Sequence, residues 1–116
     1  MPSPSSQGID EGQVEYVTPD IIRAEFNRYK LFERVNSGEL KRRVFTYDTH
    51  LNRRQRQKAG EPKCTRSQMV LYSTLDGEPV ALVHQYRRPD GTIGGKGKPD
   101  PKWLSVSGQN MKVRGT

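Results

Sequence analysis

The fold is decided by one stretch, residues 69–86, which reads MVLYSTLDGEPVALVHQY. Two apolar runs, 69–75 and 80–86, flank the four residues Asp76-Gly77-Glu78-Pro79. An Asp-Gly pair between apolar runs is a strong short-range signal for a β-hairpin. Because proline has no backbone N–H to donate to a sheet, Pro79 belongs at the start of a strand or on an edge. We therefore expect this hairpin to form the centre of the fold.

A helix is predicted upstream of the hairpin, over residues 18–35. Thr18-Pro19-Asp20 combines an N-cap, a proline suited to the first helical position and an acid at the positive end of the helix dipole. Apolar side chains then recur at spacings of four, three and three, as on one helix face: Ile22, Phe26, Tyr29 and Phe32. The sequence Asn36-Ser37-Gly38 favours the end of the helix just after residue 35.

Two more strands and two loops are predicted around the hairpin. Residues 40–48 alternate imperfectly and fit a strand better than a helix, and residues 102–106 fit a last short strand. Residues 49–67 are polar and basic and read as a long loop, within which residues 52–58 are compatible with a short helix. Residues 87–101 are rich in Gly and Pro and read as a second loop.

The length of 116 residues leaves room for one small domain, which we place at residues 16–107. Leu, Ile, Val and Phe total 23 residues, so the core must be small. Residues 1–15 are expected to be a disordered lead-in and residues 108–116 a flexible tail. The expected class is α+β, with one N-terminal helix packed on a small antiparallel sheet of three to four strands around the hairpin.

Positive charge is concentrated in residues 41–66, which hold nine Lys or Arg against two acids, a surplus equal to the net charge of +7 for the chain. A localised cationic segment attracts phosphate and releases counterions on binding. The expected function is therefore binding of nucleic acid, RNA or DNA, through phosphate contacts made by a cationic loop, with RNA expected before DNA as the partner. The expected contact residues are Arg42, Arg53, Arg54, Arg56, Lys58, Lys63, Arg66, Lys96 and Lys98.

Lys96 and Lys98 belong to the segment GTIGGKGK, residues 91–98, which invites comparison with a phosphate-binding loop. The nucleotide-binding P-loop requires Gly, four residues, and then Gly-Lys followed by Ser or Thr. Here the two glycines are one residue too close, and Gly97 follows Lys96. The spacing argues against ATP or GTP hydrolysis and leaves a glycine loop that brings two lysines near a phosphate backbone.

An alternative function is metal-independent cleavage of RNA. His84 is a candidate general base on a 2′-hydroxyl, with Arg87 or Arg88 stabilising the phosphate charge. His50 is a second candidate, because Asp48 is close enough in an extended chain to orient it. The expected order of helix, strand, hairpin and strand is also compatible with ribonuclease toxins of bacterial toxin and antitoxin systems, an analogy of architecture alone.

A third reading, from another class, is an interaction or inhibitor protein whose cationic surface meets an acidic protein. Neither a cofactor nor a metal site is expected, because no pair of His or Cys residues has ligand spacing. Cys64 is the single cysteine, so no internal disulfide can form and a cytoplasmic setting is expected. No apolar run approaches a membrane span, so no membrane partner is expected.

Overall fold

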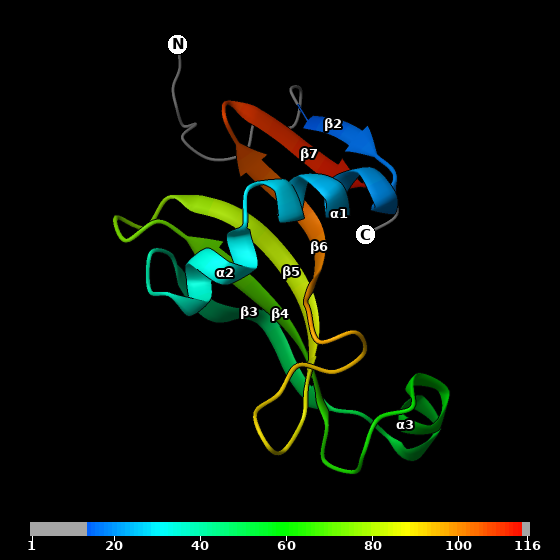
Figure 1. Cartoon of the computed structure of the whole chain (residues 1–116). Helices are drawn as coiled ribbons and strands as arrows, with labels where there is room; N and C mark the ends of the chain where they lie inside the picture. The colour runs from blue at the N-terminus through cyan, green and yellow to red at the C-terminus, as the bar shows by residue number, and fades with distance from the viewer. Residues whose placement is uncertain (1–13, 115–116) are drawn as a thin grey trace.

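The computed structural model describes residues 14–114, and this part of the chain contains six strands: β2 (Val14–Val17), β3 (Lys41–His50), β4 (Arg66–Ser73), β5 (Pro79–Arg87), β6 (Asp100–Val106) and β7 (Gln109–Val113). They form one sheet in the order β2-β7-β6-β5-β4-β3 (Figure 1). Neighbouring strands are antiparallel except β2 and β7, which are parallel. The class is α+β, as predicted, but the sheet has more than the three to four strands expected.

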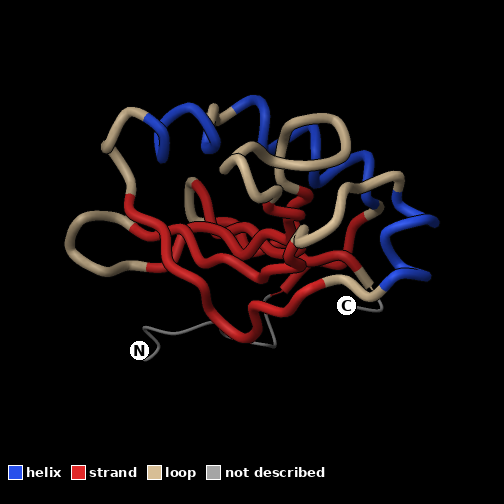
Figure 2. Tube along the Cα trace, turned by 90° about the horizontal axis from the view of Figure 1, so that it is seen from below, coloured by secondary structure: helices blue, strands red, loops and turns tan. Residues whose placement is uncertain are grey.

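The same part of the chain holds three helices rather than one: α1 (Pro19–Arg28), α2 (Leu31–Asn36) and α3 (Arg53–Ala59). Figure 2 shows α1 and α2 together on one face of the sheet, while α3 lies beyond its end. We call the face under α1 and α2 the helix face. In the described residues the opposite face has no helix against it.

The predicted N-terminal helix begins where expected, because the side chain of Thr18 accepts a hydrogen bond from the N–H of Ile21 at 3.3 Å. It does not run unbroken to Val35. Lys30 adopts the left-handed conformation, with φ of 53°, and divides the segment into α1 and α2. The break lets both pieces bury apolar side chains, Ile22 and Phe26 from α1 and Leu31 and Val35 from α2.

The predicted hairpin is present as β4 and β5, with Gly77 in the turn at φ of 97° and Pro79 as the first residue of β5. The pairing extends farther than the apolar pattern indicated, because β4 begins at Arg66, opposite Arg87. Side chains of β4 and β5 alternate between the two faces. The core lies on the helix face, where Val70, Tyr72, Ala81, Val83 and Leu104 pack under α1 and α2.

The expected loop over residues 49–67 is largely ordered secondary structure. β3 continues to His50, α3 follows, and β4 starts at Arg66. The two strands remain paired to their ends, with His50 opposite Arg66, so this segment is an extension of an antiparallel hairpin.

The expected tail is also wrong in part, because residues 109–113 form β7. Ser107 and Gly108 both have positive φ, 50° and 76°, and reverse the chain after β6. Met111 and Val113 can then enter the core. At the other end β2 begins at Val14, inside the expected lead-in, and residues 1–13 lie outside the described residues. Within residues 14–114, no helix has the length and apolar character needed to cross a membrane.

Candidate nucleic-acid interface

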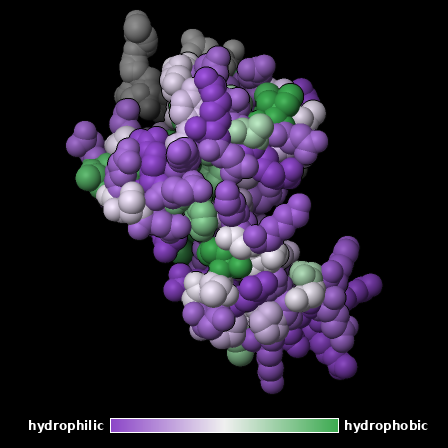
Figure 3. All heavy atoms as spheres, viewed as in Figure 1, coloured by the Kyte–Doolittle hydropathy of each residue, from purple (hydrophilic) through white to green (hydrophobic). Residues whose placement is uncertain are grey.

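The segment between β3 and β4, residues 51–65, projects from the sheet as an arm that carries α3 (Figure 1). Its base is closed by Leu51, whose side chain is buried and whose N–H donates to the carbonyl of Thr65 at 2.9 Å. α3 itself has no buried residue. Arg53, Arg54 and Lys58 are exposed and Arg56 is half-buried. Figure 3 shows hydrophilic side chains pointing outward from this lower part of the molecule.

α3 is stabilised locally rather than by packing. The side chain of Asn52 accepts from the N–H of Gln55, and the side chain of Gln55 accepts from the N–H of Asn52, both at 2.9 Å. Gly60 ends the helix in the left-handed conformation, with φ of 71°. The first turn contains no acid but does contain Arg53 and Arg54. Cations at the positive end of a helix dipole are unfavourable, so Arg53 and Arg54 destabilise α3.

Glu61, at the end of the arm, joins it to the segment between β5 and β6, residues 88–99, which we call the glycine loop. The buried carboxylate accepts from Arg88 Nε at 2.8 Å and from the N–H of Gly95 at 2.8 Å. The hydrogen bond from Arg88, with that from Gly95, holds the pKa of Glu61 below its ordinary value. A Cβ at Gly94 would lie 2.6 Å from Glu61 Oε2, so the approach requires glycine there. The two loops predicted from the sequence are thus one connected surface.

A row of hydrogen-bonded side chains crosses β5, β4 and β3 at this end of the sheet; we call Gln85, Gln68, Asp48, Arg66 and His50 the polar row. Gln85 Nε2 donates to Gln68 Oε1 at 2.8 Å, and Gln68 Nε2 donates to Asp48 Oδ1 at 3.2 Å. Arg66 Nε donates to the same Oδ1 at 2.6 Å. This bond from Arg66 is the main cause of the lowered pKa of Asp48.

His50 ends the polar row. Its Nε2 lies 3.0 Å from Arg66 Nη1, and because arginine only donates, Nε2 accepts this hydrogen bond. The sequence suggested that Asp48 orients His50. In the structure Arg66 lies between them and bonds to both.

His84 is on the other face of the sheet from His50. His50 pairs with Arg66 and His84 pairs with Met69, and residues three apart on β4 point to opposite faces. His84 is half-buried, lies 2.8 Å from Ser67 Oγ through Nε2, and meets Tyr86 edge to face. Burial, with the charge of Lys102, lowers the pKa of His84 and favours its neutral form. The structure therefore does not bring the two histidines together.

A pocket of about 320 Å³ lies on the face opposite the helices, between Phe45, Leu71, Leu82 and Trp103, with Arg43 and Lys112 among its lining residues. A second pocket, of about 510 Å³, lies between α1, the end of β5 and the glycine loop, and we call it the α1 pocket. Its lining includes Arg23, Gln85, Lys96 and Lys98.

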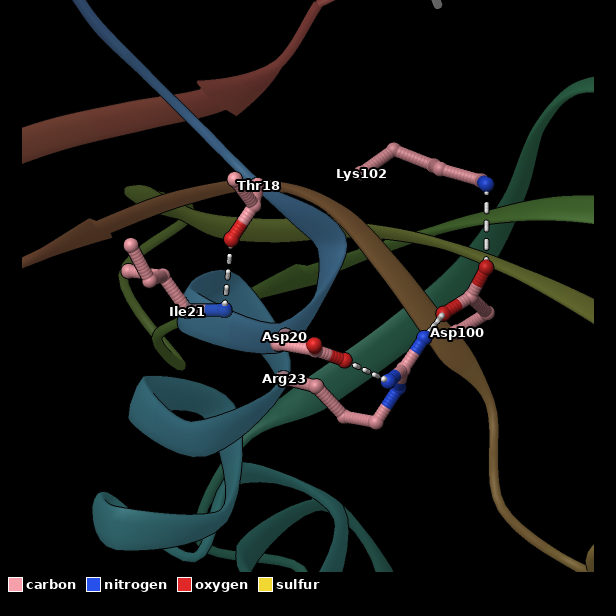
Figure 4. Close-up of polar contacts among 6 residues, drawn as sticks. All are labelled: Thr18, Asp20, Ile21, Arg23, Asp100 and Lys102. Carbon is pink, nitrogen blue, oxygen red and sulfur yellow. Dashed lines mark hydrogen bonds and ion pairs between the residues drawn. The ribbon is translucent and has the colours of Figure 1, made fainter.

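One wall of the α1 pocket is fixed by ion pairs, which Figure 4 shows. Arg23 extends from α1 to Asp20 on its own helix, at 3.1 Å, and to Asp100 at the start of β6, at 3.6 Å. Lys102 holds the other oxygen of Asp100 at 2.9 Å. Asp100 is thus balanced by two cations. Of the two lysines of the glycine loop, Lys98 forms an ion pair with Glu33, and Lys96 remains as the positive charge at the edge of the pocket.

The remaining predicted contact residues divide between two places. Lys63 is exposed on the arm, and Lys96 and Lys98 are exposed on the glycine loop, where Lys98 lies 3.7 Å from Glu33. Arg87 is exposed at the end of β5, opposite Arg66. Arg42 is apart from these residues, because it lies eight positions before His50 on β3, roughly 25 Å along an extended strand.

Sequence reasoning missed Gln68, Gln85 and Glu61. A signal existed for the two glutamines, because each occupies a position that the alternation of its strand assigns to the buried face. A polar residue at such a position requires a partner. Glu61 carried no comparable signal, because its partner Arg88 is 27 residues away.

No group of three or more His, Cys, Asp or Glu residues within residues 14–114 is arranged to hold a metal ion. Comparison of the chain with protein-family models, with curated proteins and with solved structures found no match.

Proposed function

We propose that the protein binds nucleic acid, RNA in preference to DNA, through the arm and the adjoining glycine loop. The observation that carries the proposal is the composition of α3. It is a helix that buries nothing, and its first turn places Arg53 and Arg54 at the positive end of the dipole. An anionic backbone against these exposed cations would relieve their mutual repulsion and release counterions.

The connection through Glu61 supports the same proposal. It neutralises Arg88 but leaves the cations of α3 and of the glycine loop exposed. Because Glu61 is bonded to Gly95, next to Lys96, the two cationic segments are held at one end of the molecule. A surface of this kind suits several successive phosphates, and binding should then release counterions and depend on salt.

The test is the salt dependence of RNA binding, measured by fluorescence anisotropy with a labelled single-stranded RNA. The variant changes Arg53, Arg54 and Arg56 to Gln. The control removes the same charge from the rest of the molecule by changing Lys30, Lys41 and Arg114, all exposed, to Gln. Each phosphate contact adds about 0.7 to the slope of log K against log salt for single strands, so the arm variant should lose about 2 units of slope and the control should keep the parent slope.

Equal slopes for the parent and the arm variant would remove α3 from the interface. Competition with DNA of the same sequence tests the preference for RNA. Absence of RNA and DNA binding even at low salt would favour the third reading, a cationic surface for an acidic protein.

Ribonuclease activity is the second candidate. His84 borders the α1 pocket from β5, with its imidazole bonded to Ser67 on the face opposite the helices, and its lowered pKa keeps the imidazole able to accept a proton at neutral pH. In the proposed step a ribose 2′-oxygen gives its proton to His84 and attacks the adjacent phosphorus, which forms a 2′,3′-cyclic phosphate. The bond to the 5′-oxygen breaks, and that oxygen takes up a proton from water, while protonated His84 later returns its proton to solvent.

Incubation of RNA with the protein in EDTA tests this candidate. His84→Ala should abolish cleavage and His50→Ala should leave it, because His50 is on the other face and bonded to Arg66. Cleavage that survives His84→Ala would show that His84 is not the base.

A further inference from the structure

The orientation of one side-chain amide in the polar row is set by a carboxylate several residues away. Asp48 only accepts hydrogen bonds, so the group that Gln68 turns toward it must be the NH₂. Gln68 Oε1 then faces Gln85 and can be satisfied only by the NH₂ of Gln85. Gln85 Oε1 is left pointing elsewhere. Through these two hydrogen bonds, the position of Asp48 fixes the direction in which Gln85 Oε1, on β5, can accept a hydrogen bond.

That acceptor has no protein partner among the described residues. Gln85 is only 4% exposed, and its Oε1 is a buried oxygen without a hydrogen bond. Buried polar atoms of this kind are rare in folded proteins and call for a specific explanation. Gln85 lines the α1 pocket, so a donor inside that pocket would meet this oxygen once the buried side chain turns toward it.

The other residues of the pocket suit a phosphate. Lys96 and Lys98 stand on the glycine loop at its edge, and Gly94 and Gly95 bring backbone close to the same space. The volume of about 510 Å³ lies within the range of roughly 300–1,000 Å³ typical of small-molecule sites. One buried acceptor and a cationic edge fit the two ends of a nucleotide, base and phosphate.

We propose that the α1 pocket binds one nucleotide of the RNA, with Gln85 Oε1 accepting a hydrogen bond from the amino group of adenine or cytosine and Lys96 or Lys98 contacting the phosphate. This site rests on the proposed function and adds base selectivity to it. The amino group of adenine or cytosine projects beyond the ring edge. The N3–H of uracil lies between two carbonyl oxygens, which a lone acceptor repels.

The site is tested by calorimetric titration with AMP, CMP, UMP and inorganic phosphate. AMP and CMP should bind about tenfold more tightly than UMP, in line with the discrimination that a well-made base contact provides. Gln85→Leu should remove this difference. Gln68→Leu should weaken this difference without touching the nucleotide, because the Gln85 amide loses the partner that fixes its orientation.

Two further measurements test the proposal without the Gln85→Leu variant, in case that variant does not fold. The parent protein alone must prefer AMP to UMP, and equal affinities would overturn the base contact. Changing exposed Lys96 and Lys98 to Gln should weaken all three nucleotides several-fold, and unchanged affinities would overturn the phosphate contact. No detectable binding of any nucleotide would overturn the site as a whole.

The arm variant separates this site from the proposed function. Its α1 pocket is unaltered, so AMP should bind as it does to the parent while RNA binding weakens. If the parent binds AMP and UMP equally but the arm variant binds RNA more weakly than the parent, the pocket is overturned and the arm stands. If the parent prefers AMP but the arm variant binds RNA as the parent does, the arm is overturned and the pocket stands.

Discussion

The helix face of the sheet has two halves of opposite chemistry built on the same strands. Along β4 the side chains on this face run Arg66, Gln68, Val70 and Tyr72, from charged to largely apolar. The apolar half is covered by α1 and α2, and the polar half is next to the glycine loop (Figure 1). The first half gains stability from burial. In the second half, the hydrogen bonds of the polar row fix the directions of the buried amides and leave Gln85 Oε1 without a partner among the described residues.

The largest expected effect comes from the apolar half. Leu104 is fully buried under α1, so Leu104→Ala should lower the free energy of unfolding by about 2–5 kcal/mol. Urea denaturation measures it. Leu75→Ala is the control, because Leu75 is 64% exposed and its change should cost less than about 0.5 kcal/mol.

The same variant tests whether the halves are separate in function. At temperatures where Leu104→Ala remains folded, its RNA affinity should equal that of the parent. A large loss of affinity in the folded variant would mean that the apolar half also shapes the binding surface.

A smaller effect is expected at the junction of the arm and the glycine loop. Gly94→Ala places a methyl group against the Glu61 carboxylate and should destabilise the protein by about 1–3 kcal/mol, as overpacking does. RNA affinity should fall as well, because the arm loses its tie to Gly95.

A double-mutant cycle with Glu61→Ala identifies the cause. If the clash with Glu61 is responsible, Gly94→Ala should cost much less in the Glu61→Ala background than in the parent. Additive effects would instead place the strain in the backbone of residue 94.

The capping box of α3 should have a smaller and local effect. Asn52→Ala removes the acceptor for the N–H of Gln55 and should destabilise α3 by about 1 kcal/mol. Because α3 buries nothing, the loss should appear as faster amide hydrogen exchange in residues 53–59 with little change in global unfolding. Arg54→Ala serves as the control that leaves the box intact. An equal loss of stability in global unfolding and in local exchange would show that α3 is coupled to the core.

The contrast between the halves also explains what the sequence could predict. The hairpin, the start of α1 and the apolar face of β5 follow from local patterns, Asp76-Gly77, Thr18-Pro19 and the period of two. β7 was missed because its burial depends on pairing with β6 and β2, which no local pattern encodes. α3 lacks the apolar stripe by which helices are recognised, and its capping box is the sole local signal.

The candidate site was predictable in charge but not in geometry. The cations of the arm are visible as a local surplus. The tie between Glu61 and Arg88 and the acceptor of Gln85 depend on contacts between residues far apart in the chain. The buried positions of Gln68 and Gln85 show in the alternation of their strands, but their partners and the tie of Glu61 to Arg88 do not, so only the structure shows that the two basic loops share one end of the molecule.

The smallest expected effect is a pH dependence at His84, on the face opposite the polar row. Its pKa is lowered from 6.5 in the folded state, so below pH 6.5 the unfolded chain binds a proton that the folded chain binds less readily. Stability should therefore be complete above pH 6.5 and fall as the pH drops below it. Thermal unfolding between pH 7.5 and 5.5 measures this fall.

His84→Gln isolates this contribution, since the glutamine keeps a polar group near Ser67 and does not titrate. The parent should lose more stability than the variant over this interval, because only the parent has an imidazole at residue 84 that takes up a proton more readily in the unfolded chain. Glu61 and Asp48 do not contribute to this difference. Their pKa values are lowered in the folded state, so the stability that they add is lost only at a pH below this interval. Identical pH profiles would mean that His84 is as easily protonated in the fold as outside it. Solvent would then reach the His84 imidazole on this face, and burial would not be acting on its pKa.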